Sequence, residues 1–241
     1  NLANAHLKNS GVEGFLAFNL ISNKKITWDV SVNASYNKNI VNNFKDPNSG
    51  KALVINTGQI TGQGVSATTA QIFTNDQPVN VYFLKQFSGF DSGGNQKISA
   101  NPVLKGYDPN PSVLAGFSTS IRYDKFTLGI NMGGSFGFKI YNNTATSVTN
   151  IAGIAQGRNI DKKAFNSAEK PSSGVSASDR FLENGNYWKL RNATITYTVG
   201  NVGKSVKNVS AYVTGSTLFV IIKFSGFDPE VNVANSASGY P

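Results

Sequence analysis

The residues most suggestive of catalysis are Gly133-Gly134-Ser135-Phe136-Gly137, which match the G-x-S-x-G pattern of a nucleophile elbow. There a serine on a sharp strand-to-helix turn attacks an acyl carbon, and a histidine further along the chain accepts its proton. The only histidine, His6, lies upstream, and no helical pattern follows Ser135. A hydrolase therefore stays an alternative that replacing Ser135 by Ala would test, and the chain is expected not to be an enzyme.

Two glycine patterns could bind phosphate groups. Residues 62–67 fit G-x-G-x-x-A, but no helix pattern follows them, so a flexible loop is the better interpretation. Gly203-Lys204-Ser205 are similar to the end of a P-loop, yet Thr198 stands where the first glycine is required. A tight turn between two strands is predicted at residues 203–205 instead.

Metal chemistry has little support in the residue types. With no cysteine and one histidine there is no transition-metal cluster. Asp228 and Glu230 could take part in a calcium site, although a hydrogen-bonded loop is the preferred interpretation. The sequence thus predicts no cofactor, no metal and no catalytic residue, and it leaves the substrate-binding residues unknown.

The composition points to an all-β protein. Only 15% of the residues are charged, 11% are aromatic, and Val, Ile, Thr, Phe and Tyr recur in short alternating runs. The net charge of +9 raises nucleic acid as a partner, but the lysines are scattered and form no basic stripe with aromatic residues. Nucleic acid is therefore not expected, and the charges are assigned to loops and to a wetted interior.

The clearest predicted strand covers residues 26–36, where the side chains alternate between apolar and polar. Trp28 and Tyr36 lie near opposite ends of its apolar side. This suits a strand that faces a bilayer, because aromatic residues are enriched at both membrane interfaces. No apolar run is long enough for a membrane helix. About seven strands are predicted, at residues 12–20, 26–36, 113–123, 126–133, 193–199 and 209–213, with a weaker candidate at 79–87.

The connectors differ sharply in length. Residues 22–25, 124–125 and 200–208 are short, whereas 38–78 and 142–186 are long and polar and are expected to be loops. Outer-membrane barrels pair short periplasmic turns with long outer loops, and compact soluble domains seldom carry such loops. A partial antiparallel transmembrane β-barrel is therefore predicted, with strands too few to close by themselves. Residues 87–111 are not placed by periodicity, and a soluble extracellular β-sandwich for binding or adhesion is the alternative.

Several segments resemble the SusC/RagA family of TonB-linked outer-membrane proteins. The strongest covers residues 178–192, where S-D-R-F, an acidic residue, G-x-Y and L-R-N occur in the family's order. Residues 223–231 are similar to the family's [YF]-S-G-x-D-P-E segment. Further matches lie at residues 7–13, at 36–39, and at 109–111 leading to Gly116-Phe117. The chain departs from the pattern at residues 216–219, where the family usually has a Q-N-L-F type of sequence.

The resemblance implies that residues 1–241 are the C-terminal part of a barrel of about twenty-two strands, with the plug domain and the last strand absent. It implies TonB-dependent import of glycans or peptides across the bacterial outer membrane for nutrient uptake. The expected partners are a SusD-like surface lipoprotein, TonB through the missing N-terminal region, the transported solute and outer-membrane lipid. The chain itself would supply barrel wall and loops.

Overall fold

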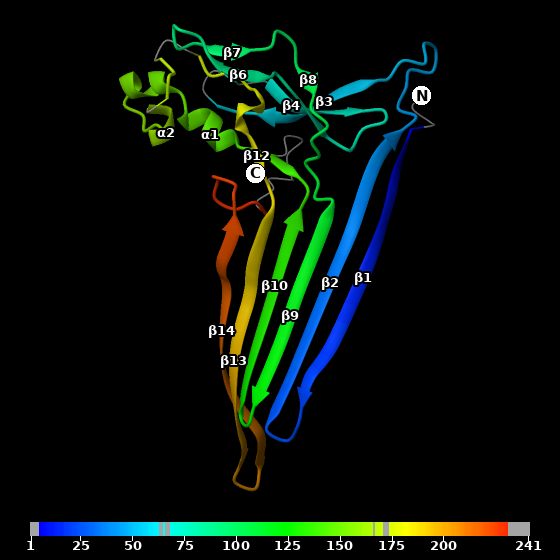
Figure 1. Ribbon diagram of the computed structural model, residues 1–241, viewed down its shortest axis with the longest axis vertical. Helices are drawn as coiled ribbons and strands as arrows, with labels where there is room; N and C mark the ends of the chain where they lie inside the picture. The colour runs from blue at the N-terminus through cyan, green and yellow to red at the C-terminus, as the bar shows by residue number, and fades with distance from the viewer. Residues whose placement is uncertain (1–4, 63–64, 66–67, 166, 171–173, 231–241) are drawn as a thin grey trace.

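A computed structural model describes residues 5–62, 65, 68–165, 167–170 and 174–230 of the chain. Its main feature is a six-stranded antiparallel sheet in the order β1-β2-β9-β10-β13-β14 (Figure 1). The strands are β1 (His6–Ser22), β2 (Ile26–Asn42), β9 (Val113–Tyr123), β10 (Phe126–Phe136), β13 (Tyr187–Val202) and β14 (Val206–Ile222). Among the described residues β1 and β14 do not pair with each other, so the sheet stays open, as expected from the strand count.

The three hairpin turns between these strands all lie at one end of the sheet (Figure 1). The first is fixed by Asn23, whose Oδ1 accepts hydrogen bonds from the backbone N–H groups of Lys25 and Ile26. Asp124 in the second turn and Gly203 in the third have positive φ, at 51° and 68°, as tight hairpin turns require. The prediction of a turn at Gly203-Lys204-Ser205 is confirmed.

The register of the sheet gathers the alternating side chains into two continuous faces. One transverse row of paired residues is apolar on every strand: Leu16, Val32, Phe117, Met132, Leu190 and Phe219. The adjacent row points to the other side and is mostly polar: Ala17, Ser31, Ser118, Asn131, Asn192 and Ser216. A slip of one residue in any ladder would mix the two rows, so the pattern itself specifies the register.

The opposite end of the sheet carries an outer layer made of the two long connections and the stretch between β5 and β9. It contains the four-stranded sheet β3-β4-β5-β8 and the pairs β6-β7 and β11-β12. Its strands are β3 (Val54–Ile60), β4 (Thr68–Thr74), β5 (Val81–Leu84), β6 (Phe87–Phe90), β7 (Gln96–Ile98), β8 (Val103–Leu104), β11 (Lys139–Tyr141) and β12 (Leu182–Asn184). Short helices complete it: α1 (Asn143–Val148), η1 (Ile151–Gln156), α2 (Lys162–Phe165) and η2 (Asp179–Phe181).

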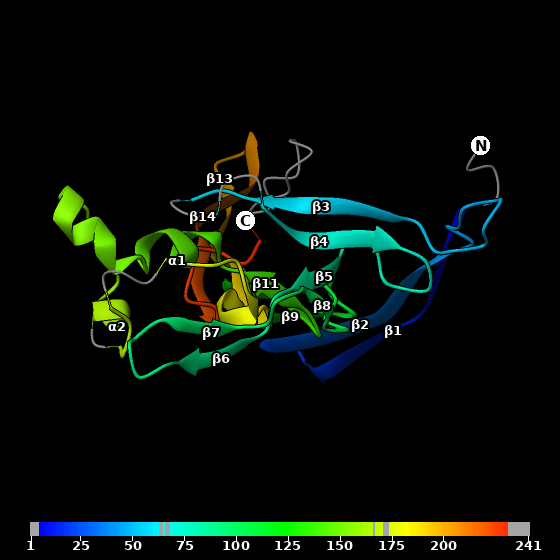
Figure 2. The ribbon, with the colours of Figure 1, turned by 90° about the horizontal axis from the view of Figure 1, so that it is seen from above.

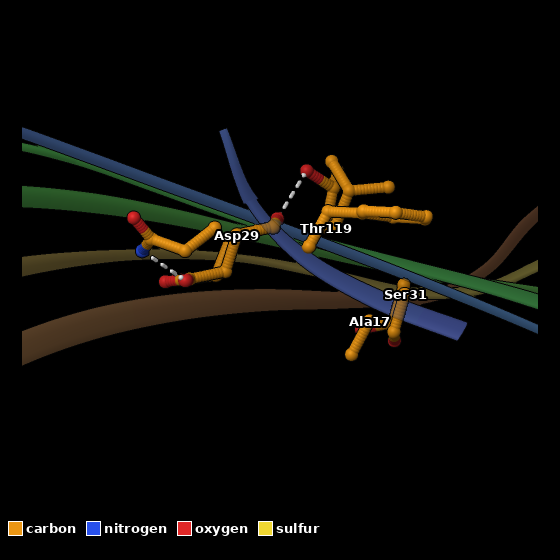
Figure 3. A pocket seen from close by; sticks show the side chains of 9 residues that line it. Ala17, Asp29, Ser31 and Thr119 are labelled. Carbon is orange, nitrogen blue, oxygen red and sulfur yellow. Dashed lines mark hydrogen bonds between the residues drawn. The ribbon is translucent and has the colours of Figure 1, made fainter. Parts of the chain in front are cut away.

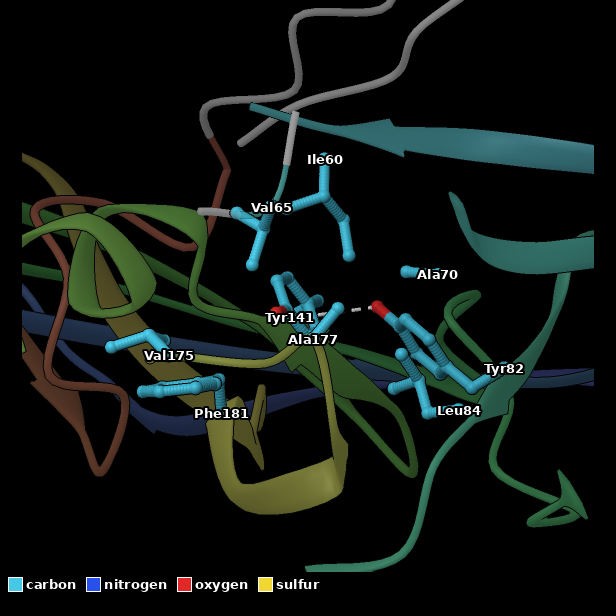
Figure 4. Packing of buried hydrophobic residues seen from close by; sticks show 9 residues of the cluster. All are labelled: Ile60, Val65, Ala70, Tyr82, Leu84, Tyr141, Val175, Ala177 and Phe181. Atoms are coloured by element: carbon cyan, nitrogen blue, oxygen red, sulfur yellow. Dashed lines mark hydrogen bonds between the residues drawn. The ribbon is translucent and has the colours of Figure 1, made fainter. Parts of the chain in front are cut away.

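The outer layer has a hydrophobic core of its own. Tyr82, Leu84, Tyr141 and Phe181 pack there with Ile60, Val65, Ala70, Val175 and Ala177 (Figure 4). The Tyr82 hydroxyl donates to the Lys139 carbonyl and accepts from the Tyr141 N–H, at 3.2 and 3.1 Å. Desolvation raises the pKa of both phenols, that of Tyr141 to about 12. The long connections thus lie together at one end of the long sheet, as expected for outer loops, but they form a folded layer.

One predicted strand belongs elsewhere. The weak candidate at residues 79–87 contains β5, a strand of the outer layer, and so the long sheet has six strands from this chain where about seven were expected. Residues 87–111, which periodicity did not place, also form part of the outer layer. Short strands with mixed burial produce no sustained alternation, which explains both results.

Candidate functional site

The apolar face of the long sheet is open to its surroundings. Val12 and Val213 are 71% and 77% exposed, and Leu16, Phe18, Ile195 and Ile221 are each more than half exposed. In the described part of the chain no second layer covers these side chains, whereas a soluble sandwich would bury them. An apolar surface of this extent marks a protein or membrane contact.

Aromatic rings border this face at both ends. Near the turns, Phe126 and Tyr197 are in contact at 4.9 Å between ring centroids, with Tyr123 paired to Phe126 across the ladder. At the other end Phe136 and Trp188 lie 5.9 Å apart. The 11 residues of β10 span about 34 Å at ~3.4 Å per step. A tilt of about 40° reduces this to about 26 Å, the height of the apolar band in outer-membrane barrels.

One polar group on the apolar face is internally satisfied. The Trp28 Nε1–H donates to Thr119 Oγ1 at 3.0 Å, and Thr119 Oγ1 in turn donates to the Asp29 carbonyl at 2.9 Å. Because Thr119 is paired with Val30, it stands among apolar neighbours. Its hydroxyl gives the indole N–H a partner that hydrocarbon could not supply.

The polar face carries hydrogen-bonding groups suited to a hydrated solute. Asn131 donates to Asn192 at 2.8 Å, and Arg122 donates to Thr27 Oγ1 at 2.6 Å. A shallow pocket of about 320 Å³ lies across β1, β2 and β9, where Asn19 donates to the Asp29 carboxylate at 2.7 Å (Figure 3). In the same view Ala17 and Ser31, which are paired across the ladder, lie next to each other and apart from Asp29.

Beyond β14 the chain folds back over the upper end of the polar face. This rim segment, residues 224–230, is held by Lys189, whose Nζ lies 3.0 Å from Asp228 Oδ2 and 2.7 Å from Glu230 Oε2. Glu230 also accepts hydrogen bonds from the Tyr187 hydroxyl at 2.7 Å and from Arg191 at 3.0 Å. Phe224 is buried with Tyr187, Phe138 and Ile140, against Val220 and Ile222. The ammonium group of Lys189 thus lies between the two carboxylates, at the place where a calcium ion would have to bind.

A β-bulge directs Arg191 toward Glu230. The ladder between β10 and β13 shifts between Asn131 and Met132, so that Arg191 has no partner residue in this ladder. A Cβ on Gly133 would lie 2.5 Å from Arg191 Nε, so any larger residue would displace the Arg191 side chain from this position. Burial by itself raises the pKa of Glu230, but the hydrogen bonds from Lys189 and Tyr187 outweigh it and hold that pKa below its usual value.

Ser135 is a structural residue of this network. It lies within β10, not at a strand-to-helix turn, and its buried Oγ donates to the Tyr187 hydroxyl at 2.9 Å. His6, at the start of β1, is three strands away in the sheet order β1-β2-β9-β10-β13-β14. The hydrolase alternative therefore lacks its base and its turn.

The S-D-R-F motif joins two parts of the outer layer. Asp179 Oδ1 accepts the Phe87 N–H at 2.7 Å, and its Oδ2 lies 2.8 Å from Lys105 Nζ. The guanidinium of Arg180 lies 5.1–5.2 Å from the ring centroids of Phe87, Phe90 and Phe181. It also pairs with the buried Glu169 at 2.8 Å. The motif thus stabilises the fold of the loops.

The remaining motifs show no chemistry in the described residues. The G-x-G-x-x-A segment at 62–67 lies largely outside them, so that interpretation stays a prediction. Within them, no three His, Cys, Asp or Glu side chains come together as a metal site. None of the helices in the described part of the chain is both long enough and apolar enough to cross a bilayer.

Comparison with known proteins finds one curated relative along nearly the whole chain. No protein-family model matches the chain. Over 98% of its length it is 25% identical to a protein named TonB-dependent receptor SusC, from Bacteroides thetaiotaomicron. The chain is thus similar to a SusC-type receptor along nearly its whole length. The match covers 25% of that relative's length, so the chain spans about a quarter of it.

Solved structures of the RagAB peptide importer have the same fold. The importer in its open-open state superposes with a TM-score of 0.77 over 92% of this chain and 26% of its own, at 20% identity. A second RagAB peptide transporter structure gives 0.77 over 97% and 27%, at 21% identity. The SusC/RagA-type resemblance and the all-β partial barrel predicted from the sequence are therefore confirmed. The matched proteins are named as a receptor and transporters, which supports the prediction that the chain is not an enzyme.

The residues that build the rim were only partly visible in the sequence. Asp228 and Glu230 were singled out as possible calcium ligands, but Tyr187, Lys189 and Arg191 were noted only as part of a family motif. A signal was present, because Tyr187, Lys189 and Arg191 alternate with the apolar residues Trp188 and Leu190.

Proposed function

We propose that this SusC/RagA-type chain forms part of the wall and outer loops of a plugged barrel in the bacterial outer membrane. The observation that carries the proposal is the register: all six strands place apolar side chains on one uncovered face and hydrogen-bonding side chains on the other. Hydrocarbon on one side and water on the other is the environment that leaves neither face mismatched. The open edges of β1 and β14 would pair with further strands of the same barrel.

The transported solute would pass along the polar face. Serine, threonine and asparagine side chains there exchange hydrogen bonds readily with a hydrated solute, which fits glycans or peptides. TonB would act through a plug domain outside residues 1–241, and the outer layer would meet a SusD-like lipoprotein that caps the mouth. The names of the relatives, a TonB-dependent receptor and a peptide importer, support this assignment.

Two neighbouring residues of β1 offer a matched test of the wall. Leu16 is on the apolar face near mid-height and Phe15 is on the polar face, and both are more than half exposed, at 58% and 67%. In the full-length protein, a lysine on the lipid side near mid-height costs about 2–4 kcal/mol of folding free energy in a bilayer. Leu16→Lys is expected to destabilise the folded protein in the bilayer by that amount, and Phe15→Lys by less than about 1 kcal/mol.

The readout is the folded fraction of the full-length protein in lipid vesicles, followed by its mobility in unheated gels. Uptake of labelled glycan or peptide by cells that carry the assembled Phe15→Lys protein reports the transport role separately. Equal tolerance of both substitutions would show that both faces meet water and would refute the membrane wall.

A further inference from the structure

The short helix α2 presents two lysines and a phenylalanine at the surface of the outer layer. Ala164 is 2% exposed and anchors the helix, whereas Phe165 is 66% exposed. The N–H groups of Ala164 and Phe165 both donate to the Asp161 carbonyl, and the Lys163 N–H donates to Asp161 Oδ1 at 2.7 Å. Burial of Ala164 therefore fixes which side faces outward and leaves Lys162, Lys163 and Phe165 exposed.

The surface around α2 carries more positive than negative charge, because Glu169 is paired and the carboxylate of Asp161 stands against three lysines. Glu169 is bound by Arg180 and by Gln96 Nε2, both at 2.8 Å, and its side chain is 1% exposed. Lys170 is exposed where its N–H donates to the Gly94 carbonyl. Within the described residues, Lys162, Lys163 and Lys170 form no ion pair with a carboxylate. Together with Phe165 they make up a basic patch.

The position of the basic patch indicates what it faces. From above, β3 and β4 and the rim segment lie on one side of the long sheet, whereas α2 and the β6–β7 pair lie on the other, beyond β14 (Figure 2). The rim segment covers the polar face through Lys189, so α2 overhangs the side of the apolar face. It does so at the end opposite the three short turns (Figure 1).

We propose that the basic patch docks on the phosphate-bearing lipid headgroups of the outer leaflet next to the barrel. This inference rests on the proposed membrane wall, since that wall places lipid directly below the overhang. Lysines near an anionic surface each strengthen binding about fivefold, and an exposed ring beside them can enter the headgroup region. The outer layer would then be held by contacts with lipid headgroups as well as by its connections to the strands.

The test uses the full-length protein in detergent and vesicles that contain phosphorylated lipid A. Lys162→Gln/Lys163→Gln is expected to weaken vesicle binding about 25-fold, from about fivefold for each lysine. Wild-type protein should lose binding similarly on dephosphorylated lipid A, and Phe165→Ser should weaken it further. The matched control is Lys204→Gln/Lys207→Gln, which removes two exposed lysines at the opposite end and should change binding less than twofold.

The outcomes separate this inference from the proposed function. Binding of the α2 variant equal to that of the wild type, or an equal loss in the control, overturns the basic patch as a lipid site. A changed oligomeric state with unchanged lipid binding assigns the patch to a contact between copies and also overturns it. Failure of the wild-type protein to enter bilayers at all would instead refute the membrane wall. Unheated-gel mobility checks that each variant is folded.

Discussion

Replacing Lys189 by Met should release the rim segment from the wall. The Lys189 side chain is 8% exposed, and its ammonium pairs with two carboxylates that are 31% and 28% exposed. Removal of one partner from a fully buried pair costs about 3–5 kcal/mol, and an exposed pair contributes at most about 1 kcal/mol. The lysine is buried and its two partners are partly exposed to solvent. We therefore expect Lys189→Met to destabilise the closed rim segment by about 2 kcal/mol, which makes opening of residues 224–230 about 30-fold more frequent.

Hydrogen–deuterium exchange of the full-length protein measures this opening directly. The Ser225 N–H donates to Glu183 Oε2 at 2.6 Å, and the Glu230 N–H donates to Asp228 Oδ1 at 2.9 Å, so both amides report on the segment. The control is Arg191→Met, which removes another cation from Glu230 but one that is 51% exposed, and it should accelerate exchange less than about fivefold. Equal effects of the two substitutions would refute the argument that burial sets the strength of each pair.

Two further predictions concern ionised groups outside the wall. Because Glu230 has a lowered pKa in the folded chain, its stabilising contribution is complete above its usual value of 4.5 and is lost as the pH falls below it. Exchange at residues 224–230, corrected for intrinsic rates, should therefore rise on acidification, and Glu230→Gln should flatten this dependence; an unchanged dependence would contradict it. In the outer layer, Arg180→Met leaves the carboxylate of Glu169 buried without its guanidinium and should cost about 3 kcal/mol, seen as faster exchange in β6 and β7. Arg122→Met, which removes an exposed guanidinium bound to Thr27, should leave that exchange unchanged.

Identical sequences in this chain have different environments. Phe87-Ser88-Gly89-Phe90-Asp91 contains β6, which ends at Phe90, and both of its rings contact Arg180. The same pentapeptide at residues 224–228 follows β14, with Phe224 buried and Phe227 99% exposed. Only the second copy leads from the end of a strand into a loop, whereas the first contains a strand of its own. The residues brought in from distant parts of the chain decide the difference.

Strand ends show the same limit. The predicted strand 113–123 coincides with β9, because its alternation continues to both ends. In contrast, β2 continues to Asn42 through residues 37–42, which do not alternate between apolar and polar but pair with β1 as far as His6. Likewise β13 begins at Tyr187, six residues before the predicted start at 193, where Lys189 and Arg191 face the rim segment.

The sequence by itself determined the two-faced strands and the short turns, because side chains alternate along any extended chain and tight turns need only a few local residue types. It also carried the motifs of the family. Only the tertiary structure decided that β2 pairs with β9 across some seventy intervening residues, that the long connections fold into an outer layer, and that Lys189 meets Asp228 and Glu230. These contacts join residues far apart in the chain, and their free energy depends on the whole packed arrangement, which no local pattern encodes.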